Sequence, residues 1–293
     1  MNLVEIQCSS NENKGVLYVV ATPIGNYKDI TERAVDILKT VDIVLAEDTR
    51  RTKPLLQRIG AGKPKIIAFH DHNEEQVLTK FIEELLGGKS VALVSDAGTP
   101  LISDPGYVLV AAAHDRGITV TPVPGVCAAI AALSVSGMPT DKFFFIGFLP
   151  PKTQQRRKAL SALKAQQGTL VLYESTHRII ACLKDCLLEL GDRKAVMARE
   201  LTKVYETVRL SSLQGLIEYV ESDVNQQKGE FVILIEGEKN YIEAGSEKDV
   251  DRYLHIMMKE LSLKQAVGLT SEMLGVKKNI VYERALQLKD ELK

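Results

Sequence analysis

The chain has 293 residues, enough for about two domains, and its 45% hydrophobic and 26% charged residues exclude a largely disordered protein. The formal net charge is −1, from 37 Lys and Arg against 38 Asp and Glu, so total charge gives no indication of a nucleic-acid partner. No apolar stretch approaches the roughly 20 residues that span a bilayer, and the start of the chain lacks the basic-then-apolar pattern of a secretion signal, so we expect a cytoplasmic protein that binds no membrane.

Strand and helix patterns alternate from residue 16 onward. Strands are predicted at 16–20, 41–46, 66–69, 91–94 and 119–123, and helices at 29–39, 74–86 and 106–114. This alternation predicts an N-terminal α/β domain with a mostly parallel sheet over residues 15–123. Because ligands bind outside the carboxyl ends of parallel strands, we expect the polar turns after Val20, Ala46 and Val94 at a binding edge.

A second α/β domain is predicted over residues 124–240, with strands at 143–147, 170–173, 195–198 and 231–236. Residues 238–250 are polar and weakly patterned, as in a linker. The tail, 245–293, has two apolar-periodic helices separated at Gly275 and is similar to a helix-turn-helix. Two helices with a glycine turn are also a common packing module, so nucleic-acid contact and plain packing both stay open.

Basic residues are clustered although the whole chain is nearly neutral. Residues 49–65 contain six Lys or Arg and no acid, and residues 151–168 contain five and no acid. Such clustering indicates one anion-facing surface, and a solvated helix face is the alternative. The cysteines give no further site: Cys182 and Cys186 are spaced i, i+4 without a second Cys/His pair, so we expect buried thiols, no metal and no disulfide.

Two turns rich in small residues have the character of a ligand site. The loop 96–100 (DAGTP) combines a carboxylate, a hydroxyl and residues that allow a ligand close to the backbone, and 124–129 (PGVCAA) opens a helix of small residues. The loop 96–100 is neither a dinucleotide fingerprint nor a phosphate-binding P-loop. Taken alone, 96–100 is equally explained as a common turn after a strand, and 124–129 as the start of a helix packed tightly on a sheet.

Six segments in chain order carry a resemblance: LYVVATPIGNYKDIT, AEDTRRTKPLL, VALVSDAGTPLISDPGY, PGVCAAIAALSVSGMPTDKFFFIGFLP, YESTHR and ARELTK. Together they closely resemble the RsmI family of 16S ribosomal RNA cytidine 2′-O-methyltransferases over about residues 15–240, and the tail is similar to the family's C-terminal region. Three positions differ from the family's usual residues: Arg51 replaces a frequent His, Val126 a common Pro and Thr176 a frequent Pro.

The resemblance implies a two-domain tetrapyrrole-methylase-like α/β fold, that of the class III methyltransferases, with a small C-terminal helical module. It implies S-adenosyl-L-methionine as cofactor, in a cleft between the two domains, and a cytidine ribose in the decoding centre of the small ribosomal subunit as substrate. Members of the family are often homodimers. The cofactor residues it implies, with Ser103 added as a neighbour, are Pro23, Ala97, Gly98, Thr99, Ile102, Ser103, Cys127, Ala128 and Tyr173.

Methylation of a hydroxyl requires alignment of the reactants and removal of a proton. Candidate catalytic groups near the cleft are Asp96, Glu47 and Asp48, with Lys203 as a group that polarises the hydroxyl or binds phosphate. Structural ion pairing is the alternative for each of them. The predicted RNA contacts are Arg50, Arg51, Arg156, Arg157, Lys277 and Lys278.

Two other functions compete with RNA methylation. A methylase of a small tetrapyrrole-type substrate would share the fold but would not need the basic segments or the helical tail. A non-catalytic ribosome-binding module would need the basic segments but not the two small-residue turns.

Overall fold

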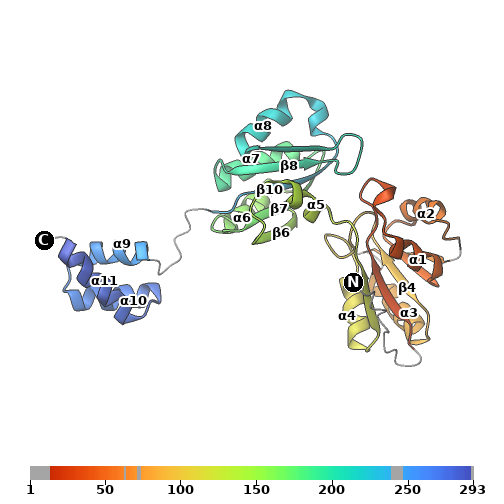
Figure 1. The fold of residues 1–293 in the computed structure, drawn as a ribbon, viewed down its shortest axis with the longest axis horizontal. Coiled ribbons are helices and arrows are strands. Elements are labelled where there is room, and N and C mark those ends of the chain that lie inside the picture. Colours follow the sequence, from red (N-terminus) through yellow and green to blue (C-terminus); the bar gives the residue numbers. More distant parts are fainter. Residues whose placement is uncertain (1–13, 63, 71–73, 239–246, 292–293) are drawn as a thin grey trace, which may run out of the picture. The chain divides into compact units, whose positions relative to one another are not determined.

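The computed structural model describes residues 14–62, 64–70, 74–238 and 247–291, in two compact units (Figure 1). The first unit ends at Gly237 and contains two β-sheets, and the second contains the helices that follow. Among the described helices, none combines the length and apolar character that crossing a bilayer requires. The predicted division at residues 123 and 124 is not tested by this grouping and stays a prediction, while the boundary at 240–245 lies outside the described residues.

The first sheet was predicted to be mostly parallel, and all four of its strand pairs are parallel, with strand order β3-β2-β4-β1-β5. The strands are β1 (Val16–Val20), β2 (Ile43–Ala46), β3 (Lys65–Ala68), β4 (Val91–Val94) and β5 (Thr119–Val123). The helices are α1 (Glu32–Thr40), α2 (Thr49–Arg58), α3 (Glu74–Leu86) and α4 (Tyr107–Asp115), with a 3₁₀ turn at Tyr27–Asp29. Alternate strand residues face α3 and α4 on one side and α1 and α2 on the other, so both faces are covered.

Two elements here differ from the sequence prediction. Helix α1 begins at Glu32 and not at residue 29, because the Thr31 side chain accepts the Ala34 N–H at 3.2 Å and caps the helix. Helix α2 was not predicted, since its segment contains Pro54 and many bases. Asp48 starts it by accepting the Arg50 N–H at 2.8 Å.

The second sheet is mixed, with strand order β6-β7-β10-β8-β9. Only β6 and β7 pair in parallel, and the other three pairs are antiparallel. The strands are β6 (Phe143–Phe148), β7 (Thr169–Ser175), β8 (Lys194–Arg199), β9 (Thr207–Ser212) and β10 (Glu230–Ile235). Strand β9 was missed by the sequence prediction, although the start of its segment alternates between polar and apolar residues as an exposed strand does.

The two faces of the second sheet are covered unequally. Helix α5 (Ala128–Val135) packs on one face. The other face holds α6 (Thr153–Ala162), α7 (Ile179–Leu190) and α8 (Leu213–Ser222), followed by a 3₁₀ turn at Val224–Gln227. Cys182 and Cys186 of α7 are buried free thiols in this core, as expected.

The second unit is a bundle of α9 (Glu247–Met257), α10 (Leu263–Leu274) and α11 (Lys278–Glu291) around a small apolar core. The predicted break is present: Gly275 ends α10 in the left-handed conformation, with a φ of 64°. Arg284 of α11 makes a two-pronged ion pair with Asp251 of α9, both contacts at 2.6 Å. Helix α9 starts at residue 247, inside the predicted linker 238–250, whose residues 239–246 lie outside the described part.

Candidate functional site

A pocket of about 460 Å³ lies at the carboxyl ends of β2 and β4 and is closed on its other side by residues of the second sheet. Its volume falls within the range of small-molecule sites, about 300–1,000 Å³. The predicted residues that line it are Glu47, Arg51, Asp96, Ala97, Gly98, Thr99, Ile102, Ser103, Cys127, Ala128 and Tyr173. The structure therefore brings both small-residue turns to one cavity.

The loop after β4 is fixed by backbone contacts. Gly98 exchanges two hydrogen bonds with Thr22 at the end of β1, of 2.8 and 3.0 Å. The φ of Gly98 is 83°, a conformation that favours glycine, and a Cβ there would lie 3.4 Å from Cγ2 of Ile24. The Thr99 hydroxyl donates to the Val126 carbonyl at 2.9 Å, which ties this loop to the second turn. The backbone on the pocket wall is thus held open to a ligand.

Two non-glycine residues farther along this loop also adopt the left-handed conformation, with φ values of 72° at Leu101 and 68° at Ser103. Residues held in such conformations cost of order 1–3 kcal/mol each and cluster at ligand sites. Gly147, in a bulge of β6, packs so closely here that a Cβ would lie 2.8 Å from the Ser103 hydroxyl. The surrounding structure therefore determines the shape of the loop.

Tyr173 forms the opposite wall and also caps a helix. Its hydroxyl accepts the Ala129 N–H at 3.1 Å, which satisfies a backbone donor in the first turn of α5. Phe145 and Phe148 of β6 pack edge-on against its ring at centroid distances of 5.1 and 5.7 Å. Burial raises the pKa of Tyr173 well above its ordinary value, so the phenol is neutral and acts as a hydrogen-bonding group.

A chain of polar contacts links the pocket to the basic helix α2. Asp96 accepts the Asp48 N–H at 2.9 Å, and its other oxygen pairs with Arg51 at 3.4 Å. Asp48 pairs with Arg50 at 2.7 Å, and hydrogen bonds from the Arg50 side chain and backbone lower the pKa of Asp48 to about 2. A carboxylate with so low a pKa is a weak base, so Asp48 is suited to capping α2.

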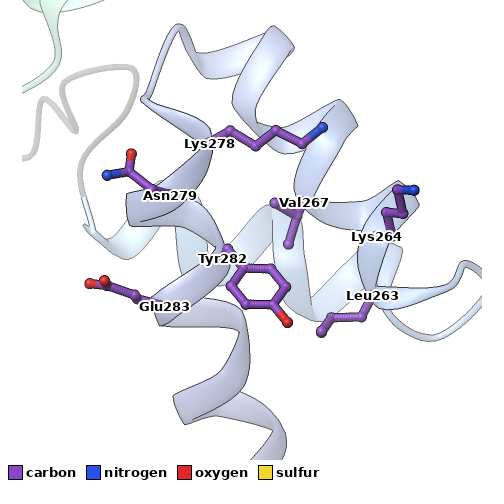
Figure 2. Close-up of a pocket in the computed structure, with 7 residues that line it drawn as sticks. All are labelled: Leu263, Lys264, Val267, Lys278, Asn279, Tyr282 and Glu283. Atoms are coloured by element: carbon purple, nitrogen blue, oxygen red, sulfur yellow. The ribbon is translucent and has the colours of Figure 1, made fainter.

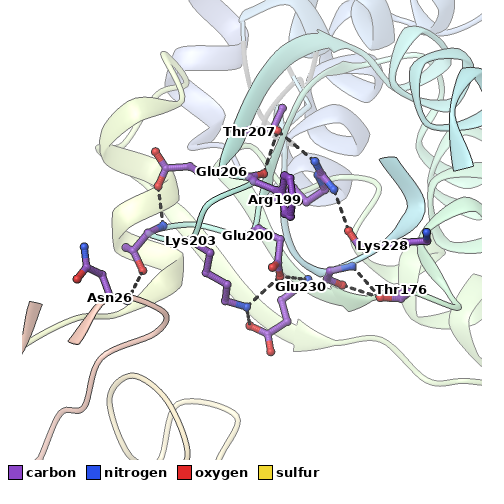
Figure 3. Close-up of polar contacts among 12 residues, drawn as sticks. Asn26, Thr176, Arg199, Glu200, Lys203, Glu206, Thr207, Lys228 and Glu230 are labelled. Atoms are coloured by element: carbon purple, nitrogen blue, oxygen red, sulfur yellow. Dashed lines mark hydrogen bonds and ion pairs between the residues drawn. The ribbon is translucent and has the colours of Figure 1, made fainter. Parts of the chain in front are cut away.

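Lys203 lies in a second cluster, on the loop between β8 and β9, and Figure 3 shows its ammonium between two carboxylates. It contacts Glu200 and Glu230 at 2.9 Å each. Partial burial alone would lower the pKa of Lys203, but these hydrogen bonds outweigh it and raise the pKa. Lys203 is therefore a fixed positive charge beside the pocket wall formed by Glu230.

The Lys203 loop is itself strained and closely packed. Glu200 and Thr202 have φ values of 49° and 67°. The Thr202 hydroxyl accepts the Asn26 N–H at 3.1 Å from the loop after β1 (Figure 3), and a Cβ on Gly25 would lie 2.5 Å from Cγ of Lys203. This loop therefore contacts the first turn of the other sheet directly.

The sequence pattern of the Tetrapyrrole (Corrin/Porphyrin) Methylases matches residues 16–217. The chain is 48% identical to "Ribosomal RNA small subunit methyltransferase I" of Escherichia coli O157:H7 over 280 residues, 95% of this chain and 97% of that protein. The protein of the same name from Pseudomonas aeruginosa is 48% identical over 275 residues, 93% of this chain and 97% of its own length.

The chain belongs to the RsmI family of tetrapyrrole methylases. The resemblance found in the sequence is thereby confirmed, and the RsmI C-terminal HTH domain pattern matches residues 244–289. Among solved structures, the uroporphyrin-III-C-methyltransferase from Thermus thermophilus superposes with a TM-score of 0.54 at 22% identity, covering 76% of this chain and 94% of that chain. At that identity the likeness confirms the fold alone.

Of the predicted cofactor and catalytic residues, three do not line the pocket of this RsmI-family chain. Pro23 lies in the turn before Ile24, which does line it. Asp48 and Lys203 stand behind Asp96 and Glu230 in the two polar clusters. Conversely, sequence reasoning missed several lining residues, among them Asp104, Phe148, Leu201, Glu230 and Val232. Asp104, Phe148 and Leu201 lie inside quoted motifs, but β10, which holds Glu230 and Val232, carried no motif at all.

The predicted RNA contacts need one correction, at Arg156. Its side chain is 3% exposed and pairs with the buried Asp185 of α7 at 2.6 Å. A guanidinium buried with its counter-charge cannot reach a phosphate without breaking that pair, so Arg156 is structural. The side chains of Arg50, Arg51 and Arg157 are 88%, 66% and 46% exposed, and Lys277 and Lys278 are exposed in the second unit.

Proposed function

We propose that this chain methylates small-subunit ribosomal RNA, transferring a methyl group from S-adenosyl-L-methionine to the 2′-hydroxyl of a cytidine ribose in the decoding centre of 16S rRNA. The observation that carries the proposal is 48% identity over 95% of the chain to a protein named as a small-subunit rRNA methyltransferase. Such a substrate also implies a cytoplasmic location.

The pocket fits the cofactor in size, shape and charge. Gly98 and the small side chains of Ala97 and Ala128 leave backbone groups accessible, while Ile102, Leu201 and Val232 offer apolar surface for a ring. Carboxylates line the same cavity at Glu47, Asp96, Asp104 and Glu230, a setting that favours a cationic sulfonium. When bound, the cofactor supplies the electrophilic methyl group.

The chain's own contribution is to position the reactants and accept a proton. Well-aligned reactants gain on the order of 7–11 kcal/mol, whereas a general base adds about 10²- to 10⁴-fold. Of the four predicted catalytic groups, Glu47 and Asp96 line the pocket, and we assign them to the substrate hydroxyl. Asp48 holds α2 and Lys203 holds its loop, so both act as positioning residues.

RNA is favoured over a small tetrapyrrole because exposed cations surround the pocket side of α2. Arg50 and Arg51 project from that helix, and Arg51 also lines the pocket, so a phosphate bound there would be close to the cofactor loop. A non-catalytic ribosome-binding module would have no use for the strained, open loop at 97–103.

We also propose a homodimer, with the edge strand β6 in the contact. The aromatic side chains of this strand, Phe143, Phe144, Phe145 and Phe148, are 37–54% exposed. Among the described strands, β6 pairs only with β7, so its other edge is open to a second copy. Sedimentation of the wild type against Phe144→Asp tests this, and a monomeric wild type would refute it.

The test of the function is transfer of labelled methyl from S-adenosyl-L-methionine to 30S subunits that lack the modification, with the label mapped by resistance of the ribose to alkaline cleavage. We expect label at one cytidine of 16S rRNA, and none with Gly98→Trp. Cofactor binding by calorimetry without label on subunits or free rRNA would reject the ribosomal substrate.

A further inference from the structure

The second unit has a pocket of its own, between the first turns of α10 and α11, with a volume of about 680 Å³ (Figure 2). Its lining residues are Leu263, Lys264, Val267, Lys278, Asn279, Tyr282 and Glu283. The sequence analysis predicted only Lys278 of these as an RNA contact. The pocket is separate from the methylation site, because its walls come from the helical unit alone.

The residues of this pocket suit a ligand that has a flat ring and a negative charge near it. Tyr282 is 45% exposed, and Val267 is a buried aliphatic side chain of the opposing helix. Lys264 and Lys278 are exposed, and Figure 2 shows both side chains on the Val267 side of the ring, away from Glu283, the single acid of the lining. Asn279 adds an amide that can both donate and accept hydrogen bonds.

One further cation of α11, Arg284, is already committed to a structural contact. Arg284 pairs with Asp251 through two contacts and with Gln287 at 2.8 Å, so it holds α11 to α9. The charge available to a ligand is therefore concentrated at the start of α11 and on α10, where the pocket lies. Its sign is positive and complements a phosphate backbone.

The geometry of RNA excludes the usual use of a helix-turn-helix. In DNA the second helix enters a wide major groove, but the major groove of an A-form RNA helix is deep and too narrow for side chains to read. Proteins that recognise RNA sequence instead stack unpaired bases on aromatic rings and hold the backbone with cations. Tyr282 with Lys264 and Lys278 supplies both parts.

We infer that the pocket between α10 and α11 binds an unpaired RNA base, stacked on Tyr282, with Lys264 and Lys278 contacting the flanking phosphates. This inference rests on the proposed function, since it names the part of the rRNA that the tail holds. It assigns the helix-turn-helix a single-stranded ligand and not a duplex.

The chain contains no tryptophan, so a single Tyr282→Trp substitution makes a unique fluorescent reporter. The probe is a 12-nucleotide single-stranded RNA of mixed sequence, compared with the duplex of the same sequence, on the full-length protein. We expect the single strand to quench the fluorescence of the Tyr282→Trp variant at far lower concentration than the duplex. The matched control is Ile280→Trp, at a position that is 52% exposed on the same helix but outside the pocket, and its fluorescence should not be quenched.

Affinity for the same RNA, followed by anisotropy of a labelled strand, gives the second measurement. Tyr282→Ala should weaken binding about 5- to 150-fold, and Tyr282→Phe should restore it, because stacking needs the ring and not the hydroxyl. Lys278→Ala should lower the salt dependence by about 0.7 in log–log slope, while Lys289→Ala, exposed elsewhere on α11, should not.

The outcomes separate this inference from the proposed function. If the wild type methylates 30S subunits but the Tyr282→Trp variant is not quenched, or the duplex quenches it equally, the base site is wrong and the methyltransferase stands. If no rRNA is methylated but the single strand quenches that variant, the base site stands without the proposed function. Circular dichroism of Tyr282→Ala checks that this variant is folded. If it is not, the test rests on the two aromatic variants: a Tyr282→Trp protein that binds the single strand as tightly as Tyr282→Phe but is not quenched would overturn the site.

Discussion

Two loops of the α/β unit hold non-glycine residues in the left-handed conformation, and different forces keep them there. The loop after β4, with Leu101 and Ser103, is held by backbone hydrogen bonds and close packing of small residues. The loop after β8, with Glu200 and Thr202, is held by charge, through Lys203 and its two carboxylates, and by the hydrogen bond between Thr202 and Asn26.

The difference shows how each side of the pocket is built. A wall that offers backbone to a ligand cannot be fixed by large side chains, because they would fill the space. The loop after β8 supports the pocket from behind and can use a charged cluster. Its stability is therefore sensitive to pH and to loss of one charge. Both loops therefore store strain, but only the first uses glycine at the cavity surface.

The largest effect is expected from Gly98→Val in the first loop. A β-branched residue with a φ near 83° is strained, and its side chain would project against Ile24 and into the cavity. We expect cofactor affinity to fall roughly 100-fold, about 3 kcal/mol, in calorimetry. Gly62→Val is the control, because a Cβ there meets nothing within 4 Å and its φ is not positive. Equal affinity in both variants would contradict this account of the loop.

The next effect tests the charged loop with Lys203→Met. The substitution leaves Glu200 and Glu230 close together without their shared cation, and we expect the free energy of unfolding to fall by about 1–2 kcal/mol, between the values for surface and buried pairs. The measurement is denaturant unfolding, with Lys184→Met, a surface pair to Glu221, as control. An effect no larger than the control's would argue against this role.

The free energy of unfolding that Lys203→Met loses should depend on pH in a defined direction. The pKa of Lys203 is raised, so its contribution is complete below the ordinary value of 10.5 and disappears as pH rises through the raised pKa. Burial alone would raise the pKa of Glu200, but hydrogen bonds from Lys203 and the Glu230 N–H lower it below its ordinary 4.5. Its contribution is complete above pH 4.5 and disappears as pH falls further. The difference between wild type and Lys203→Met should thus be greatest between about pH 5 and 10.

A smaller effect is expected from Tyr173→Phe. The ring contacts with Phe145 and Phe148 remain, but the Ala129 N–H loses its acceptor at the start of α5. We expect a loss of about 1 kcal/mol in unfolding free energy, with cofactor affinity reduced less than by Gly98→Val. Unchanged stability together with a large loss of affinity would instead mean that the hydroxyl contacts the cofactor.

The smallest effect compares Ser103→Gly with Thr202→Gly. Glycine relieves strain at both positions, but Thr202 also loses the hydroxyl that accepts the Asn26 N–H. In denaturant unfolding, the free energy of unfolding of Ser103→Gly should lie within about 1 kcal/mol of the wild-type value, and Thr202→Gly should be less stable than Ser103→Gly. The reverse order would show that strain, and not the hydrogen bond, dominates the second loop.

Sequence reasoning succeeded where local pattern and chain order decide the structure. The five strands of the first sheet alternate with helices, so their parallel arrangement and the common edge for Glu47 and Asp96 were predictable. It failed where partners are remote. Nothing near Arg156 indicates that Asp185, 29 residues away, buries its charge, and nothing near Glu230 indicates Lys203. Arg51 and Thr176 differ from the family's usual residues, and only the structure shows what they contact. Arg51 pairs with Asp96, and the Thr176 hydroxyl bonds to the Gly229 backbone.

The strand order of the second sheet has a consequence for how the chain is made. Strand β10, the last to be synthesised, lies in the middle of that sheet, between β7 and β8. The first sheet has all its strands once residue 123 has left the ribosome, whereas β7 and β8 have no common neighbour until residues 230–235 emerge. A nascent chain released before Glu230 would carry a complete first sheet and two separated strand pairs, so the pocket exists only in a chain that has been translated through β10.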